Sequence, residues 1–88
     1  MTLSEIADRI NAHLKRFERD PVINALYEVN GSRLSRYWQA WACRSGRFVY
    51  ITYVAYQGQQ HLTKEQAEKY LAWLDAGNVG QHYKALRS

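Results

Sequence analysis

Cysteine is almost absent from this chain. Its 88 residues include one, Cys43, which can form neither an intramolecular disulfide nor a cysteine-rich metal site. Small secreted domains often depend on such cross-links because their hydrophobic cores are small. The sequence therefore argues against a disulfide-rich secreted protein and predicts a fold held together by apolar packing.

Long apolar segments are missing as well. No run of residues approaches the roughly 20 that cross a bilayer as a helix. The first residues, MTLSEIADR, are charged from Glu5 onward and contain no apolar core of a secretion signal. We therefore expect a cytoplasmic protein without membrane contact. The length suits a single domain over residues 1–88, with a stability of about 5 kcal/mol.

Acidic side chains are missing from one stretch, residues 33–47. The whole chain has 12 basic and 8 acidic residues, a net charge of +4. The stretch contains these arginines and no acid: Arg33, Arg36, Arg44 and Arg47. Arginine binds carboxylates and phosphates through paired hydrogen bonds and stacks on aromatic rings. For any one of them alone, a solubilising role at a strand edge is the simpler interpretation.

The N-terminal segment, residues 2–17, has the spacing of an amphipathic helix. Thr2 and Glu5 have the spacing of a capping box. Asp20-Pro21 is expected to end the helix, because proline disfavours helical geometry in the residue before it. Its apolar stripe recurs at helical intervals and is expected to be core: Leu3, Ile6, Ile10, Leu14 and Phe17.

A second helix is predicted to begin at Thr63, which forms a capping box with Gln66, and to end at Gly77. Trp73 is expected at the margin of its buried stripe, which consists of Ala67, Tyr70, Leu71 and Leu74. Residues 81–86 are expected to form one more helical turn. This turn would pack back onto the domain through Val79, Tyr83 and Leu86.

Between the helices, the sequence predicts a hairpin of strands 37–44 and 47–57, joined at Ser45-Gly46. One face is rich in alanine, with Ala40 opposite Ile51, and its small residues allow helices to approach closely. The other face carries large rings with polar residues between them. On it, Cys43 faces Phe48, Trp41 faces Tyr50, Gln39 faces Thr52 and Tyr37 faces Val54, with Tyr56 beyond.

Asn30-Gly31 is typical of a further two-residue turn. We therefore predict a strand over residues 25–29 that returns along 32–36, with Tyr27 facing Leu34 and Glu28 facing Arg33. Residues 58–61 are expected to form a loop. The predicted fold is α+β, a three-stranded antiparallel meander with the N- and C-terminal helices packed on one face, in the order α-β-β-β-α.

This element order resembles that of double-stranded-RNA-binding domains over roughly residues 3–76, and Leu26-Tyr27-Glu28-Val29 fits the family before its meander. The family's last helix starts with a lysine-rich sequence that grips phosphates. Here the corresponding segment, Thr63-Lys-Glu-Gln-Ala-Glu-Lys69, has acids interleaved. The resemblance is one of topology, and RNA binding is not transferred from it.

Residues able to carry chemistry are scattered along the chain. The histidines, at positions 13, 61 and 82, do not have the helical spacing of metal ligands. Cys43 is expected in mid-strand as a small apolar filler, with no helix N-terminus to lower its pKa. The hairpin holds no paired carboxylates, and the glycines form no phosphate-binding motif. We therefore expect no enzyme, no metal, no cofactor and no small-molecule substrate.

The remaining hypothesis is a binding surface on the ring-rich face, because two helices can cover only one face of a small sheet. The candidate binding residues are Tyr37, Gln39, Trp41, Phe48, Tyr50, Thr52 and Tyr56, with Arg36, Arg44 and Arg47 at the rim. We favour a protein partner, a second copy included, since Tyr, Trp and Arg are enriched in interface hot spots.

Two alternatives stay open. In one, nucleic-acid bases stack on the rings while the arginines meet phosphates. In the other, the C-terminal segment folds over Trp41 and Tyr50, and the rings are core. The preferred interpretation is a small non-enzymatic binding protein, such as an adaptor or an inhibitor of host machinery of the kind encoded by phages and mobile elements. The sequence does not identify its partner.

Overall fold

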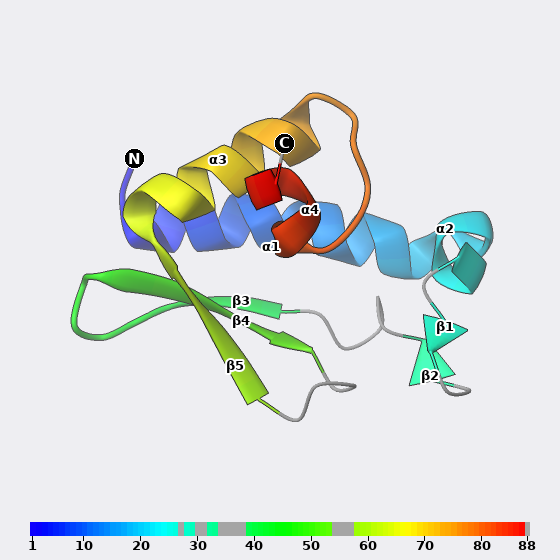
Figure 1. The fold of residues 1–88 in the computed structure, drawn as a ribbon, viewed down its shortest axis with the longest axis horizontal. Helices are drawn as coiled ribbons and strands as arrows, with labels where there is room; N and C mark the ends of the chain where they lie inside the picture. Colours follow the sequence, from blue (N-terminus) through cyan, green and yellow to red (C-terminus); the bar gives the residue numbers. More distant parts are fainter. Residues whose placement is uncertain (27, 30–31, 34–38, 54–57, 88) are drawn as a thin grey trace.

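The structure, a computed structural model, describes residues 1–26, 28–29, 32–33, 39–53 and 58–87 (Figure 1). Its elements are, in chain order, α1 (Leu3–Arg19), α2 (Pro21–Leu26), β1 (Glu28–Val29), β2 (Ser32–Arg33), β3 (Gln39–Ala42), β4 (Phe48–Tyr53), β5 (Gly58–Thr63), α3 (Lys64–Asp75) and α4 (His82–Arg87). β1 and β2 form a two-stranded hairpin, whereas β3, β4 and β5 form a separate antiparallel sheet in that order.

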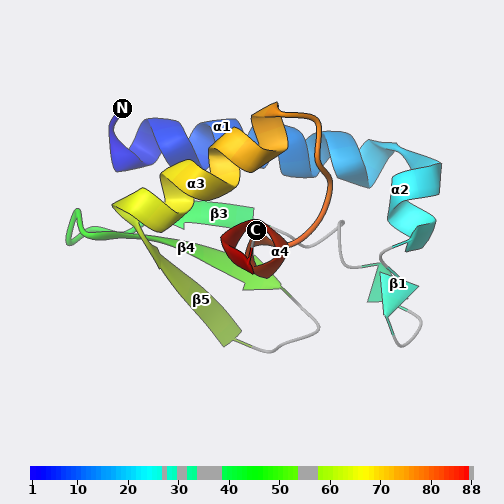
Figure 2. The ribbon, with the colours of Figure 1, turned by 45° about the horizontal axis from the view of Figure 1, so that its top comes forward.

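Helices α1, α3 and α4 lie on the same side of the three-stranded sheet, as Figures 1 and 2 show. α1 packs on β3 and on α3, and α3 follows directly from β5. The α+β class, the three-stranded antiparallel meander and the one-sided helical layer are therefore confirmed. None of the described helices combines the length and the hydrophobicity that a bilayer-spanning segment requires.

α1 begins at the predicted capping box. The Thr2 hydroxyl accepts a hydrogen bond from the Glu5 N–H at 3.1 Å, and the Glu5 carboxylate accepts one from the Thr2 N–H at 3.2 Å. The bond from the Thr2 backbone is the main cause of a lowered pKa of the Glu5 carboxyl. All five residues of the predicted stripe are buried, together with Ala7.

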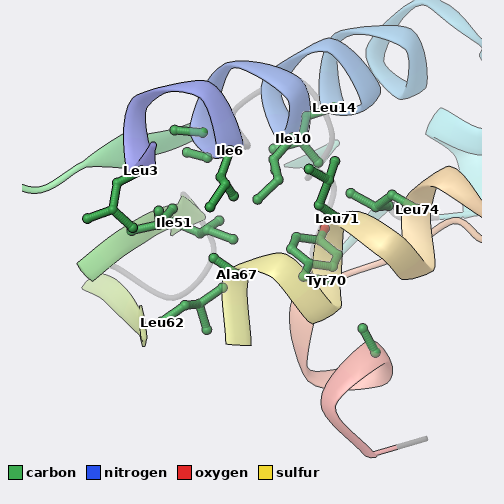
Figure 3. Packing of buried hydrophobic residues seen from close by; sticks show 14 of the residues in the cluster. Leu3, Ile6, Ile10, Leu14, Ile51, Leu62, Ala67, Tyr70, Leu71 and Leu74 are labelled. Carbon is green, nitrogen blue, oxygen red and sulfur yellow. The ribbon is translucent and has the colours of Figure 1, made fainter. Parts of the chain in front are cut away.

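A single apolar cluster fills the space between the helices and the sheet. Figure 3 shows Ile6 and Ile10 of α1 lying between Leu71 of α3 and Ile51 of β4. Ile6, Ile10 and Ile51 are completely shielded from solvent. Burial of each such side chain stabilises the fold by about 1.5–3 kcal/mol, so this layer holds the helices to the inner face of the sheet.

α3 shows both of its predicted ends. Thr63 and Gln66 form the capping box, with bonds of 3.2 and 3.0 Å. At the other end Gly77 has a φ of +98°, which an L-residue adopts only with strain. The N–H groups of Gly77 and Asn78 donate to the carbonyls of Leu74 and Trp73, the two bonds of a Schellman motif.

The C-terminal segment is tied to the helices and leaves the outer face of the sheet open. The Tyr70 hydroxyl donates to the Gly80 carbonyl at 2.7 Å, and its ring contacts His82 of α4. Val79 and Leu86 pack against the core as predicted, whereas Tyr83 is 38% exposed. The alternative in which this segment covers Trp41 and Tyr50 is therefore wrong for its described residues.

The third strand of the sheet is β5, where a loop was predicted. β5 pairs along its whole length with β4, from Phe48 opposite Thr63 to Tyr53 opposite Gly58. Leu62 provides the reason, because it faces Val49 and is buried in the core. Hydrophobic alternation does not predict this strand, because Leu62 is the one apolar residue on its inner face and the preceding residues are polar.

The predicted strand over residues 25–29 is also corrected. Residues 25 and 26 belong to α2. Of the described residues in this range, Glu28 and Val29 form the strand, paired with Ser32–Arg33 outside the main sheet. The expected pairing of Glu28 with Arg33 is confirmed, whereas the pairing of Tyr27 with Leu34 lies outside the described residues. The segment quoted for the resemblance to RNA-binding domains is therefore not the first strand of the meander.

α2 arises because Asp20-Pro21 starts a helix as well as ending one. The Asp20 carboxylate accepts hydrogen bonds from the N–H groups of Val22 and Ile23, at 2.9 and 3.2 Å. It therefore acts as the N-cap of α2. Pro21 takes the first helical position, where its missing N–H costs nothing and its fixed φ is already helical.

Asn11 of α1 holds the outer edge of β3. Its side-chain amide donates to the Ala40 carbonyl at 2.8 Å, and its oxygen accepts from the Ala40 N–H at 2.7 Å. Hydrogen-bonded pairs alternate along an antiparallel ladder, so these two Ala40 groups point away from β4. Asn11 takes the place of a neighbouring strand and closes this part of the edge.

We expect Asn11→Ala to destabilise the domain by about 1–2 kcal/mol. The two lost hydrogen bonds are worth about 1 kcal/mol each, and alanine returns a few tenths through its better helix propensity. Urea unfolding measures the difference. As a control, Asn11→Asp keeps the acceptor for the Ala40 N–H and sets a carboxylate against the Ala40 carbonyl. Asn11→Asp should therefore lose stability at neutral pH. Wild-type stability in both variants would show that the two hydrogen bonds between Asn11 and Ala40 contribute nothing.

Candidate functional site

The central hairpin has the predicted register. Ala40 faces Ile51, Trp41 faces Tyr50 and Gln39 faces Thr52. Ala40 and Ile51 are buried under the helices, so the alanine-rich face is the inner one, as expected. The predicted pair of Tyr37 with Val54 lies outside the described residues.

The turn of the hairpin is longer than predicted, but the faces are unchanged. The Cys43 N–H donates to the Phe48 carbonyl at 2.8 Å, and the Gly46 N–H donates to the Cys43 carbonyl at 3.0 Å. Arg44 and Arg47 therefore belong to a four-residue turn instead of forming the last cross-strand pair. Both loop lengths are even, so the alternation of side chains across the hairpin is the same.

The outer face carries exposed rings beside each other. Trp41 on β3 is 45% exposed, and Phe48 on β4 is 38% exposed. Tyr50, opposite Trp41, is half-buried. Apolar side chains at this exposure on one sheet face are the unusual feature of the surface, because large rings are mostly buried in small domains.

His61 belongs to this face, and sequence reasoning missed it because residues 58–61 were expected to form a loop. β5 places His61 opposite Tyr50, where the two rings meet edge to face at 5.4 Å between centroids. The Phe48 ring, two residues from Tyr50 on β4, lies 5.9 Å from the His61 ring between centroids. We call Trp41, Tyr50, His61 and Phe48 the ring row; it crosses all three strands. The signal that could have revealed the position of His61 is its neighbour Leu62. An apolar Leu62 pointing into the core would place His61 on the outer face of a strand.

The other predicted site residues fall into two groups. Gln39 and Thr52 lie together beside the ring row, where the Thr52 hydroxyl donates to the Gln39 carbonyl at 3.4 Å. Arg44 and Arg47 are exposed in the turn at one end of the face. The remaining three lie outside the described residues: Arg36, Tyr37 and Tyr56.

Cys43 differs from the buried filler that was expected. It lies just beyond β3 and is half-exposed. The Ser45 hydroxyl donates to its sulfur at 3.2 Å. This bond is the main cause of a lowered pKa of the Cys43 thiol, with smaller contributions from the N–H groups of Ser45 and Arg44. The turn therefore favours the thiolate without a helix N-terminus.

A polar cluster on the helical side joins α1 to the end of α3. His13 Nε2 lies 2.8 Å from one oxygen of Asp75, and Arg9 binds the other at 3.0 Å. Arg16 lies 3.1 Å from His13 Nδ1. A guanidinium can only donate, so Nδ1 accepts and Nε2–H points to Asp75. Both ring nitrogens are engaged, which leaves His13 no nitrogen to act as a general base in this arrangement.

No protein-family model matches this chain, and it has no significant match among curated proteins or solved structures.

Proposed function

We propose that this domain is a non-enzymatic cytoplasmic binding module that docks a protein partner through the outer face of its sheet. The single observation that carries the proposal is the pair of exposed rings, Trp41 and Phe48, on a face opposite the helical layer. Exposed aromatic clusters on small domains are commonly interaction sites.

The composition of the face suits a protein better than a small molecule. The ring row is built on strands, so its side chains are held in place before a partner arrives and lose little entropy on binding. Gln39 and Thr52 supply polar groups at its border, and Arg44 and Arg47 supply charge at one end. Aromatic residues at the centre with polar residues and arginine at the rim is the usual anatomy of a protein interface.

Affinity capture from cell extract tests the proposal when it is run with and without nuclease. We expect a protein that is retained after nuclease treatment by the wild-type domain and by Tyr83→Ala, and lost by Phe48→Ala. Tyr83 is a matched control, because it is an exposed ring of the same fractional exposure on the helical side. Equal capture by Phe48→Ala and Tyr83→Ala would contradict a site on the outer face.

Nucleic-acid binding is the second candidate, and one observation favours it. Arg44 and Arg47 are exposed beside the ring row, and the structure gives them no side-chain ion pair within its described residues. Free guanidinium groups next to stacking rings are typical of single-stranded nucleic-acid sites. Lysines are lacking in this turn, however, whereas dedicated nucleic-acid surfaces usually carry a denser basic patch.

Salt dependence separates the two candidates. If oligonucleotides bind here, replacing both Arg44 and Arg47 by alanine should flatten the slope of log affinity against log salt by about 0.7 per arginine for single strands. Fluorescence anisotropy with a labelled single-stranded oligonucleotide measures this slope. Under protein docking, we expect wild type and double variant to give the same weak, salt-labile signal.

A further inference from the structure

The outer edge of β5 presents backbone groups that point away from the sheet. The Cys43 N–H bond to Phe48 fixes which pairs are hydrogen-bonded, and the alternation then directs the N–H and C=O groups of Val49 and Ile51 toward β5. The same groups of Gln59 and His61 therefore face outward. Within the described residues, no hydrogen bond reaches them from outside the strand.

The two edge strands of the sheet differ in whether their outward backbone groups have hydrogen-bond partners. On β3, the Asn11 side chain hydrogen-bonds the outward N–H and C=O groups of Ala40. On β5, no side chain among the described residues hydrogen-bonds the outward backbone groups in this way. Figures 1 and 2 show no described helix or strand alongside the outer side of β5. Its sequence, GQQHLT, also contains none of the charged residues that usually protect an edge strand from pairing.

We propose that β5 pairs with β5 of a second copy of this chain, antiparallel about a twofold axis at Gln60. In this register, Gln59 of each copy faces His61 of the other, and both pairs exchange their two backbone hydrogen bonds. The four outward backbone groups of Gln59 and His61 on each strand then have partners. The two sheets become one, and the two ring rows lie on one continuous face.

The strand itself points to a copy of this chain as its partner. Self-pairing sets Gln60 against Gln60, and two neutral amides can donate to and accept from each other, whereas like charges at this position would repel. The alternation of side chains along β5 places Gln60 on the inner face, and yet Gln60 is exposed. The helical layer therefore stops short of the axis and leaves room there for an identical side chain. This pairing does not depend on what docks on the outer face.

Analytical ultracentrifugation of the whole chain, from about 1 µM to about 1 mM, tests the pairing. We expect the wild type to become dimeric within this range and His61→Pro to stay monomeric. Proline removes the outward N–H, which β4 does not use, so an edge position tolerates it. His61→Ala is the matched control, since it removes the imidazole and keeps the N–H, and it should still dimerise. A wild type that is monomeric throughout, or loss of dimer in both variants, overturns the proposal.

Gln60→Lys provides a second, independent test of the pairing, which is needed if the proline variant does not fold. It places two ammonium groups across the axis and should raise the dimer dissociation constant about tenfold, with partial recovery in high salt. Ala12→Lys adds the same charge on the exposed side of α1 and should leave dimerisation unchanged. An unchanged constant in Gln60→Lys overturns this register. A monomer that still captures a protein through Phe48 would overturn the pairing alone and leave the proposed function standing.

Discussion

Trp41→Ala should weaken binding of the captured protein by at least about 2 kcal/mol, roughly thirtyfold in dissociation constant. Trp41 is the largest exposed ring of the row, and it lies opposite Tyr50 and next to Gln39, where a docking partner would enclose it. Because 45% of it is already in water, its removal should cost the isolated domain about 1 kcal/mol or less. Calorimetric titration and thermal unfolding measure the two effects separately.

The control for this experiment is Tyr83→Ala, which should leave the dissociation constant within about twofold. Little dependence on salt is expected for the wild type, since the exposed rings of Trp41 and Phe48 carry no charge. Two results would contradict the proposal. One is a Trp41→Ala variant that binds as well as the wild type. The other is a variant that unfolds, which would make Trp41 part of the core instead of the interface.

Tyr70→Ala should leave most of the protein unfolded at room temperature. The side chain is completely buried, and removing a large core ring typically costs about 3–5 kcal/mol. The Gly80 carbonyl would also lose its buried hydrogen bond, at a further cost of about 1–3 kcal/mol. A domain with a stability of about 5 kcal/mol cannot absorb both losses. Circular dichroism and urea unfolding report the outcome.

Tyr70→Phe separates the ring from its hydroxyl. It should keep the fold, lose about 1–2 kcal/mol, and increase amide hydrogen exchange in residues 78–87, because the bond to Gly80 is what anchors this segment to α3. A stable Tyr70→Ala variant would contradict the central place of this ring in the core. Unchanged exchange in Tyr70→Phe would show that α4 is held by its apolar contacts alone.

Local sequence signals predicted the parts of this fold that depend on neighbouring residues. Both capping boxes, the burial of the α1 stripe and the end of α3 at Gly77 follow from spacings of three or four positions along the chain. The register of the central hairpin is also predictable from local sequence. Ala40 and Ile51 alternate with Trp41 and Tyr50 along the two strands, and this alternation fixes the two faces. The same alternation predicts that Trp41 and Phe48, the exposed rings of the candidate site, share the outer face.

Signals with two meanings were harder to interpret. Asp20-Pro21 predicts the end of a helix, yet the same pair begins α2, because an aspartate N-cap and a proline in the first turn also favour helix. Asn30-Gly31 correctly indicated the pairing of Glu28 with Arg33, but not that this hairpin would stand apart from the main sheet. A turn signal specifies which residues pair, and says nothing of which sheet they join.

Short-range signals are enough to predict α1 and α3, their caps, the hairpin and the division of its rings from its alanines, since each follows from local geometry and a period of 2 or 3.6 residues. Long-range packing is needed for the rest: β5 completes the sheet, His61 joins the ring row and the C-terminal segment packs on α3. Contacts such as Asn11 with Ala40 or His13 with Asp75 join positions 29 and 62 residues apart. No local pattern encodes them, because they form only once packing of the core has brought the two segments together.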